Sequence, residues 1–347
     1  MNEKRKIGLL FAGIMTVMLV FGLVLYAAEK NIPEKALADS GFLSEEIPLD
    51  GQDEKTWGTM TLGGQKYDIF HECQTYLLIG TDASGHNSDS AEGCQGSMSD
   101  FLLLVVLDKT QERCSFLPIN RDTMTEVTLL QNDGTGEATA DLQVCTAHWY
   151  GGSETRSCEN TVQAVSKLLG NVTIDGYYAL PMEEIPRLNR LAGGVEVTLL
   201  EDFTDTDQQM KKGKKMRLSD TQAWHYIHDR YGVGDEGNLS RMRRQRQYMQ
   251  AFMEQTGKNV KNDKHKIQTI WQELREKAVT DIPGSRISGL MEDILQSSGK
   301  EFYELEGESR VGQALGDGID HAEFYVDERS RMEILTELYA LKKRDGE

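Results

Sequence analysis

The chain of 347 residues has no surplus of positive charge. Its 38 Lys and Arg residues are outnumbered by 56 Asp and Glu residues, so the formal net charge at pH 7 is −18. A protein this acidic repels polyanions such as nucleic acid and anionic lipid surfaces. The composition therefore argues against nucleic acid as a partner, and any site for an anion must be built from arginine side chains that gather locally.

Long apolar runs are absent too, apart from one near the N-terminus. Residues 7–28 carry no charge and are preceded by a basic cluster at residues 4–6. About 20 apolar residues span a bilayer, and basic flanking residues remain in the cytoplasm. A cleaved signal peptide is the alternative, but its apolar part usually has about 7–15 residues. We therefore expect a cytoplasmic tail at residues 1–6, one transmembrane helix at residues 7–28 and an extracytoplasmic remainder, in a single-pass protein of the cell membrane.

The five cysteines lack the C-x-x-C spacing that is typical of structural zinc sites. Disulfides can form in an extracytoplasmic domain, although an odd number of cysteines leaves at least one thiol unpaired in the monomer. We predict a disulfide between Cys145 and Cys158, which flank a turn-rich stretch at residues 149–153. Closing such a loop would add about 3 kcal/mol of stability. The alternative is that all five cysteines are small buried residues.

Three short apolar runs predict buried strands, at residues 76–79, 101–107 and 115–119. Continuous apolar runs of this length are typical of strands covered on both faces, which requires helices above and below the sheet. Helices are predicted at residues 160–169, at 182–191, from Ser219 onward, at 240–258 and from about Asp327. Ser219 and Gln222 form a capping-box pattern at the start of one of these helices. This alternation of strands and helices indicates an α/β layered sandwich.

The predicted α/β domain occupies residues 68–260. Residues 29–67 are polar and show no apolar periodicity, so they are interpreted as an extracytoplasmic stalk. Residues 261–347 are interpreted as a C-terminal α/β extension, and the sequence shows no internal repeat or low-complexity tract.

Charged residues stand at the ends of the predicted strands. Asp82 follows the first strand, Asp100 opens the second, and Arg121 follows the third. Open α/β sheets collect their ligand-binding groups at strand ends. Each Asp taken alone can equally be a turn former.

A second group of polar residues lies on the helix predicted at residues 240–258. Arg241, Arg244 and Gln245 have the spacing of one helix face, and Arg230 precedes them. Arginine binds phosphate oxygens through planar pairs of donors, and Mg²⁺ is commonly held by one or two carboxylates together with substrate phosphates. The two groups therefore favour a site for a multiply charged anion with a divalent metal, such as a pyrophosphate. A solvated helix face is the alternative for the arginine run.

Several segments, in the same order, resemble the signature of the LytR-CpsA-Psr family. They are YLLIGTD at 76–82, SDFLLL at 99–104, INRDT at 119–123, AHWYGG at 147–152, GGVEV at 193–197, and RMRRQ at 241–245 after Arg230. The resemblance covers roughly residues 70 to 256, and its specificity comes from the order of the motifs, because each one is weak by itself.

The resemblance implies an α-β-α sandwich with a mixed central sheet and a long apolar pocket for a polyprenyl chain. Members of the family transfer anionic glycopolymers, such as wall teichoic acid or capsular polysaccharide, from a polyprenyl-pyrophosphate carrier to peptidoglycan, with Mg²⁺ as cofactor. The chain is accordingly predicted to be a phosphotransferase anchored in the membrane. The alternative is a non-catalytic protein that binds the lipid carrier or regulates the envelope. A DNA-binding role for the arginine run is opposed by the predicted export and by the acidic balance.

The resemblance also implies roles for single residues. Asp82 and Asp100 match the catalytic and metal-associated acids of the family, and Arg121, which matches its pyrophosphate-binding set, is predicted to be catalytic as well. The predicted pyrophosphate-binding set is Arg121, Arg230, Arg241, Arg244, Gln245 and His228.

Four positions depart from the usual pattern of the family. Met98, Phe101, Asn120 and His228 stand where Arg, Thr, Pro and Arg are common. The site is therefore expected to hold fewer fixed positive charges than usual, although His228 can still donate to phosphate. The segment between Asp82 and Asp100 is long and polar, and we expect it to form a mobile lid.

Overall fold

The structure is a computed structural model, and it describes residues 55–82, 97–130, 136–151, 153–262, 277–286 and 299–344, with residues 275, 290, 293 and 297. The predicted cytoplasmic tail, the predicted membrane span and most of the predicted stalk lie outside the described residues, as does most of the predicted lid. Among the residues that are described, no helix has both the length and the apolar character needed to cross a membrane.

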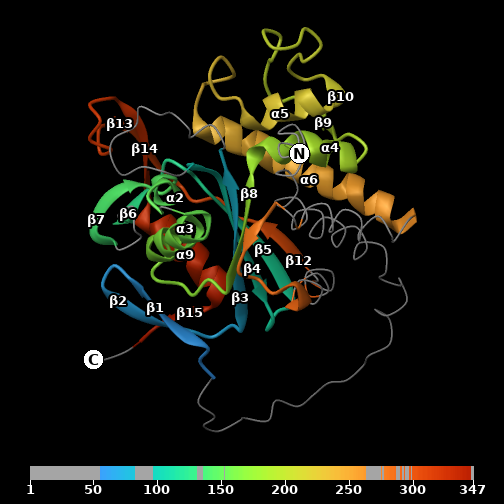
Figure 1. Ribbon diagram of the computed structural model, residues 1–347. Coiled ribbons are helices and arrows are strands. Elements are labelled where there is room, and N and C mark those ends of the chain that lie inside the picture. The colour runs from blue at the N-terminus through green and yellow to red at the C-terminus, as the bar shows by residue number, and fades with distance from the viewer. Residues whose placement is uncertain are drawn as a thin grey trace, which may run out of the picture.

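A mixed sheet of six strands, in the order β11-β8-β3-β4-β5-β12, forms the centre of the fold (Figure 1). The strands are β3 (Cys73–Thr81), β4 (Ser99–Asp108), β5 (Arg113–Ile119), β8 (Gly176–Pro181), β11 (Val279–Thr280) and β12 (Gly299–Phe302). β4 pairs antiparallel with both β3 and β5, whereas β8 is parallel to β3 and β12 is parallel to β5. The three strands predicted from apolar runs and the predicted mixed sheet are confirmed.

Helices cover both faces of this sheet. They are α2 (Thr146–Trp149), α3 (Glu154–Leu168), α4 (Ile185–Leu191), α5 (Asp220–His228), α6 (Asn238–Asn262) and α9 (Glu328–Tyr339). Side chains alternate between the faces of a strand, so Leu78 and Leu103 enter one buried core while Leu77 and Leu104 enter the other. The first core also contains residues of α4, α5 and α6, and the second contains residues of α3 and α9 (Figure 1). The predicted α-β-α layering is confirmed.

The helix ends follow local capping signals. The capping box predicted at α5 is present, because Ser219 Oγ accepts from Gln222 N at 3.2 Å and Gln222 Oε1 accepts from Ser219 N at 2.9 Å. α9 begins at the predicted place, with Asp327 as its N-cap. α3 begins six residues earlier than predicted, because Ser153 caps it by accepting from Arg156 N.

Two predicted domain boundaries are corrected by the pairing of strands. β1 (Gly58–Leu62) and most of β2 (Gln65–Ile69) fall in the predicted stalk, yet they form a sheet with β15 (Leu341–Lys343) from the other end of the chain. β11 and β12 come from the predicted C-terminal extension, yet they pair with β8 and β5 at the two edges of the central sheet. Pairing covers strand edges that would otherwise expose unpaired backbone groups. The stalk boundary at residue 67 and the domain boundary at residue 260 therefore do not separate structural units.

Three smaller two-stranded sheets complete the described fold. They are β6 (Met124–Leu130) with β7 (Gly136–Gln143), β9 (Glu196–Thr198) with β10 (Lys215–Arg217), and β13 (Gly307–Gly312) with β14 (His321–Val326).

Candidate active site

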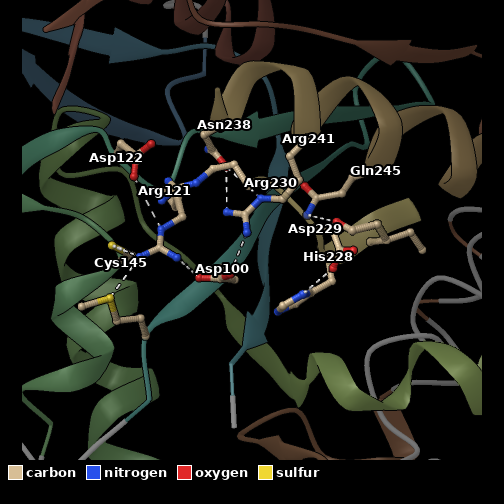
Figure 2. A network of polar contacts seen from close by, with 12 residues as sticks. Asp100, Arg121, Asp122, Cys145, His228, Asp229, Arg230, Asn238, Arg241 and Gln245 are labelled. Carbon is tan, nitrogen blue, oxygen red and sulfur yellow. Dashed lines mark hydrogen bonds and ion pairs between the residues drawn. The ribbon is translucent and has the colours of Figure 1, made fainter. Parts of the chain in front are cut away.

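The predicted site residues meet at one end of the central sheet. Because β4 is antiparallel to both of its neighbours, the end of β3, the start of β4 and the end of β5 lie together, with Thr81 opposite Ser99 and Leu102 opposite Ile119. Asp82, Asp100 and Arg121 are carried by these strand ends. The first turns of α6 and the end of α5 bring the other polar residues to the same place (Figure 2).

Asp100 is the centre of the cluster and is only 5 % exposed. One carboxylate oxygen accepts from Arg121 Nη1, and the other accepts from Arg241 Nη1 at 2.8 Å. Figure 2 shows Arg121 on one side of Asp100, Arg241 above it and the His228 ring on the other side. Burial acts to raise the pKa of Asp100, but Arg121 and Arg241 together hold this pKa below its ordinary value. Asp100 is therefore ionised at neutral pH.

The two arginines are held in place by further contacts. Arg241 Nε and Nη2 donate to Asn238 Oδ1 at 2.9 and 2.7 Å, and Asn238 Nδ2 donates to Asn120 Oδ1 at 2.7 Å. Arg121 Nη2 donates to Met98 Sδ at 3.0 Å. Sequence reasoning missed Asn238, although its position three residues before Arg241 on a helix was the available signal. The guanidinium groups are thus positioned before any ligand binds.

Cys145 and Cys158 are both free thiols, so the predicted disulfide is wrong. Cys145 lies at the N-cap of α2, where its Sγ accepts from Arg121 Nη2 at 3.3 Å. Cys158 lies inside α3, and its Sγ is 3.8 Å from His148 Nε2. The two sulfurs therefore contact different partners on either side of the turn. Burial raises the pKa of both thiols, so both are protonated at neutral pH.

Arg244 does not reach the site, which corrects its predicted role in binding pyrophosphate. Its side chain is fully buried, and Nε forms an ion pair with Glu201 Oε2 at 2.9 Å. Its Nη2 donates to Asp229 O at 2.6 Å, and Nη1 donates to Tyr226 O. The guanidinium carbon lies 5.1 Å from the ring centroid of Phe203. Arg244 therefore joins α6 to the end of α5 and has a structural role.

The remaining predicted residues lie around Asp100 in different ways. The charge of Arg230 acts on Asp122 and on Arg241, which places it beside the cluster. Gln245 is buried, with Nε2 donating to Ile227 O at 3.4 Å. His228 is the last residue of α5, and its Nδ1 lies 3.3 Å from Asp229 Oδ1. Gln245 lines one pocket together with Asp100, and His228 offers a donor atom within 4.8 Å of a carboxylate oxygen of Asp100.

A set of metal-ligating atoms is part of the same cluster. Asp82, Asp100 and His228 each offer one donor atom, and these atoms lie within 4.8 Å of one another. Carboxylate oxygens are the donors that Mg²⁺ prefers. The two acids therefore fit the predicted metal, and His228, which was predicted to donate to phosphate, also offers them a nitrogen donor.

An apolar pocket lies next to the polar cluster. It is lined by Phe101, Leu180, Pro181, Met182, Ile185, Leu188, Ile227, Gln245, Tyr248 and Met249. A second pocket shares Phe101, Gln245 and Met249 with the first and is also lined by Asp100. The apolar space therefore begins at residues that adjoin the carboxylate of Asp100, between the sheet and helices α4, α5 and α6.

Comparisons with known proteins identify the family and relatives of the chain. A model described as the LytR_cpsA_psr family matches residues 52–339. The polyisoprenyl-teichoic acid--peptidoglycan teichoic acid transferase TagU of Halalkalibacterium halodurans is 26 % identical over 250 residues, which cover 72 % of this chain and 71 % of that protein. The protein of the same name from Bacillus cereus is 25 % identical over 268 residues, which cover 76 % of this chain and 77 % of that protein.

A solved structure shows the same fold. The crystal structure of TagV from B. subtilis has a TM-score of 0.57 and 21 % identity to this chain, and the match covers 77 % of this chain and 96 % of that one.

Proposed function

Because the chain belongs to the LytR_cpsA_psr family, we propose that it transfers an anionic glycopolymer from a polyprenyl-pyrophosphate carrier to peptidoglycan. Two relatives, identical to this chain at about a quarter of the aligned residues, are named polyisoprenyl-teichoic acid--peptidoglycan teichoic acid transferases. A teichoic acid is therefore the first polymer to test.

The observation that supports this proposal is that an apolar pocket adjoins several guanidinium groups. A polyprenyl pyrophosphate has the same division, with a long apolar chain and a multiply charged head. Burying the chain against residues such as Leu180 and Met249 would contribute about 0.8 kcal/mol for each methylene group. Arg121 and Arg241 lie at the polar end, where planar guanidinium groups can bind phosphate oxygens in pairs. One ligand can therefore occupy both parts.

The charge balance of the cluster favours a divalent cation in the complex. The cluster contains the guanidinium groups of Arg121, Arg230 and Arg241. It also contains the carboxylates of Asp82, Asp100, Asp122 and Asp229. These arginines alone cannot neutralise a pyrophosphate. Asp82 and Asp100 would hold Mg²⁺ together with phosphate oxygens, and the ion would supply positive charge where the transition state gathers negative charge.

The proposed reaction is a displacement at phosphorus. A hydroxyl group of the peptidoglycan acceptor attacks the phosphorus next to the glycan, a new P–O bond forms, and the P–O bond to the bridging oxygen breaks, so that polyprenyl phosphate leaves. Phosphoryl transfer depends mostly on positioning and charge neutralisation. Arg121 and Arg241 would orient the head group. A carboxylate of the cluster, Asp82 or Asp100, would take the proton of the acceptor hydroxyl.

The location of the protein is part of the proposal. The apolar residues 7–28 would anchor the chain in the cell membrane with the catalytic domain outside, where both the lipid carrier and peptidoglycan are accessible. A reporter enzyme fused to the C-terminus should be active only outside the cytoplasm. Activity inside the cytoplasm would contradict this topology.

The test of the proposed function is transfer by the purified full-length protein in detergent. A polyprenyl-pyrophosphate-linked glycan and a peptidoglycan acceptor are supplied with Mg²⁺, and both polymer transfer and release of polyprenyl phosphate are measured. Arg121→Ala and Asp100→Asn should each lower the rate about 100-fold or more, as loss of a group that stabilises transition-state charge does. Arg243→Ala is the control, since Arg243 lies two residues after Arg241 on α6 and its side chain is 60 % exposed.

Two outcomes would contradict the assignment. Full activity in Arg121→Ala and Asp100→Asn, with normal thermal unfolding, would move the site elsewhere. Retention of an intact lipid carrier by the wild-type protein, without release of polyprenyl phosphate, would favour the alternative of a carrier-binding protein.

A further inference from the structure

His228 is placed to bind a metal ion together with the two acids. Its donor atom lies within 4.8 Å of donor atoms of Asp82 and Asp100. Asp100 already accepts from two arginines, but an ionised carboxylate has about four acceptor positions in its two oxygens, so capacity remains for an ion. The set therefore offers two carboxylates and one imidazole to the same point.

The surroundings of His228 fix the direction of its ring. Nδ1 lies 3.3 Å from Asp229 Oδ1, and Asp229 is itself held by His225 Nδ1, which lies 2.7 Å from Oδ2. The ring stacks on Trp224 with centroids 4.2 Å apart and an interplanar angle of 15°. A histidine that binds a metal usually donates its other ring N–H to a carboxylate in this way. With Nδ1 facing Asp229, Nε2 is the nitrogen that can act as a ligand.

The chemistry of the three donors points to a particular class of ion. Mg²⁺ prefers oxygen donors in octahedral geometry and parts reluctantly with its water. Imidazole suits first-row transition ions, and their affinity for nitrogen-containing sites rises from Mn²⁺ toward Cu²⁺. A set of two carboxylates and one imidazole should therefore bind Mn²⁺ or a later ion more tightly than Mg²⁺.

We propose that His228 Nε2 is the third protein ligand of the metal site formed by Asp82 and Asp100, and that the site prefers a divalent transition ion such as Mn²⁺ to Mg²⁺. The use of this ion in transfer rests on the proposed function, but the binding of the ion does not. His228 thus has a role different from donation of a hydrogen bond to phosphate.

The test is binding of Mn²⁺ alone to the full-length protein in detergent, followed by electron paramagnetic resonance. The signal of unbound Mn²⁺ gives the affinity of the protein for the ion. Pulsed measurements detect coupling between bound Mn²⁺ and a ligand nitrogen. The wild-type protein should show nitrogen coupling, which should change when its histidines carry ¹⁵N. His228→Ala should lose the coupling and bind Mn²⁺ about ten-fold or more weakly, whereas the affinity for Mg²⁺ should fall less.

Two further variants separate a ligand from a neighbouring residue. His228→Asp should recover Mn²⁺ affinity without nitrogen coupling, because a carboxylate replaces the imidazole. His321→Gln is the control, since His321 lies on the β14 hairpin outside the cluster and pairs with Asp317 at 2.9 Å. It should bind Mn²⁺ as the wild-type protein does.

The outcomes distinguish this inference from the proposed function. Mn²⁺ bound with full affinity and without nitrogen coupling would overturn the role of His228 and leave the transferase proposal intact. A His228→Ala variant that binds inorganic pyrophosphate more weakly, but Mn²⁺ as tightly as the wild-type protein, would overturn that role as well. Nitrogen coupling in a protein that transfers no glycan would support the metal site and contradict the transferase. If His228→Ala failed to fold, ¹⁵N labelling of the wild-type protein would still decide the question.

Discussion

Replacing Arg244 with methionine should weaken the fold and leave the proposed chemistry in place. The side chain of Arg244 is fully buried, and that of its partner Glu201 is 12 % exposed, with 2.9 Å between Nε and Oε2. The substitution would leave the Glu201 charge without its partner and would remove the donors to the carbonyl groups of Tyr226 and Asp229. Breaking a buried pair by removing one member costs about 3–5 kcal/mol. We expect a loss of about 4 kcal/mol in the free energy of unfolding.

The measurement is thermal and chemical unfolding of the full-length protein, followed by circular dichroism. A loss of this size should lower Tm by about 10 °C in a domain of this length. The double variant Arg244→Met with Glu201→Gln should be more stable than Arg244→Met alone by about 1–2 kcal/mol, because no buried charge is left unpaired. Arg243→Met provides the control. Its exposed ion pair with Asp235, at 3.7 Å, should contribute less than about 0.5 kcal/mol.

Activity decides whether Arg244 is structural or binds substrate. Well below its Tm, Arg244→Met should transfer glycan at a rate within a few-fold of the wild-type rate. Normal unfolding together with a loss of transfer would refute the reasoning and would restore Arg244 to the predicted pyrophosphate site.

Two further predictions concern buried groups near the turn after β7. Burial lowers the pKa of His148 from 6.5 to about 4, while the contact of Nδ1 with Ser97 O, at 2.7 Å, acts in the opposite direction. Because folding lowers this pKa, His148 makes its full contribution to the free energy of unfolding above pH 6.5. That contribution is lost as the pH falls toward 4. Between pH 7 and pH 4, the free energy of unfolding of the wild-type protein should therefore fall by up to about 3 kcal/mol more than that of His148→Gln. If urea unfolding gave the two proteins the same dependence on pH, this prediction would be wrong. In the second prediction, alkylation during unfolding without reductant should label both Cys145 and Cys158, and a peptide that joins them would contradict the structure.

Local sequence determined much of the fold and the position of the acids. The apolar runs that became β3, β4 and β5 are buried on both faces, so their composition alone required helices above and below. The capping box of Ser219 and Gln222 began α5 where it was predicted, because both hydrogen bonds lie within four residues. Asp82 and Asp100 came together because each stands at a strand end. The strands and caps depend on residues that are close in sequence, whereas the two acids meet because β3 and β4 pair antiparallel.

Only the tertiary structure decided which polar residues act together. Arg241 and Arg244 share a helix, yet residues three apart differ by about 60° around its axis, so Arg241 faces Asp100 while Arg244 faces the end of α5. The prediction of a disulfide was wrong for a similar reason, because spacing in sequence does not set the direction in which a sulfur atom points. β12 joined the central sheet through β5, which precedes it by about 180 residues. The sequence by itself determined the strands, the caps and the family, whereas contacts between distant segments determined the strand pairings at the sheet edges, the buried arginine and the place of His228 beside Asp82 and Asp100.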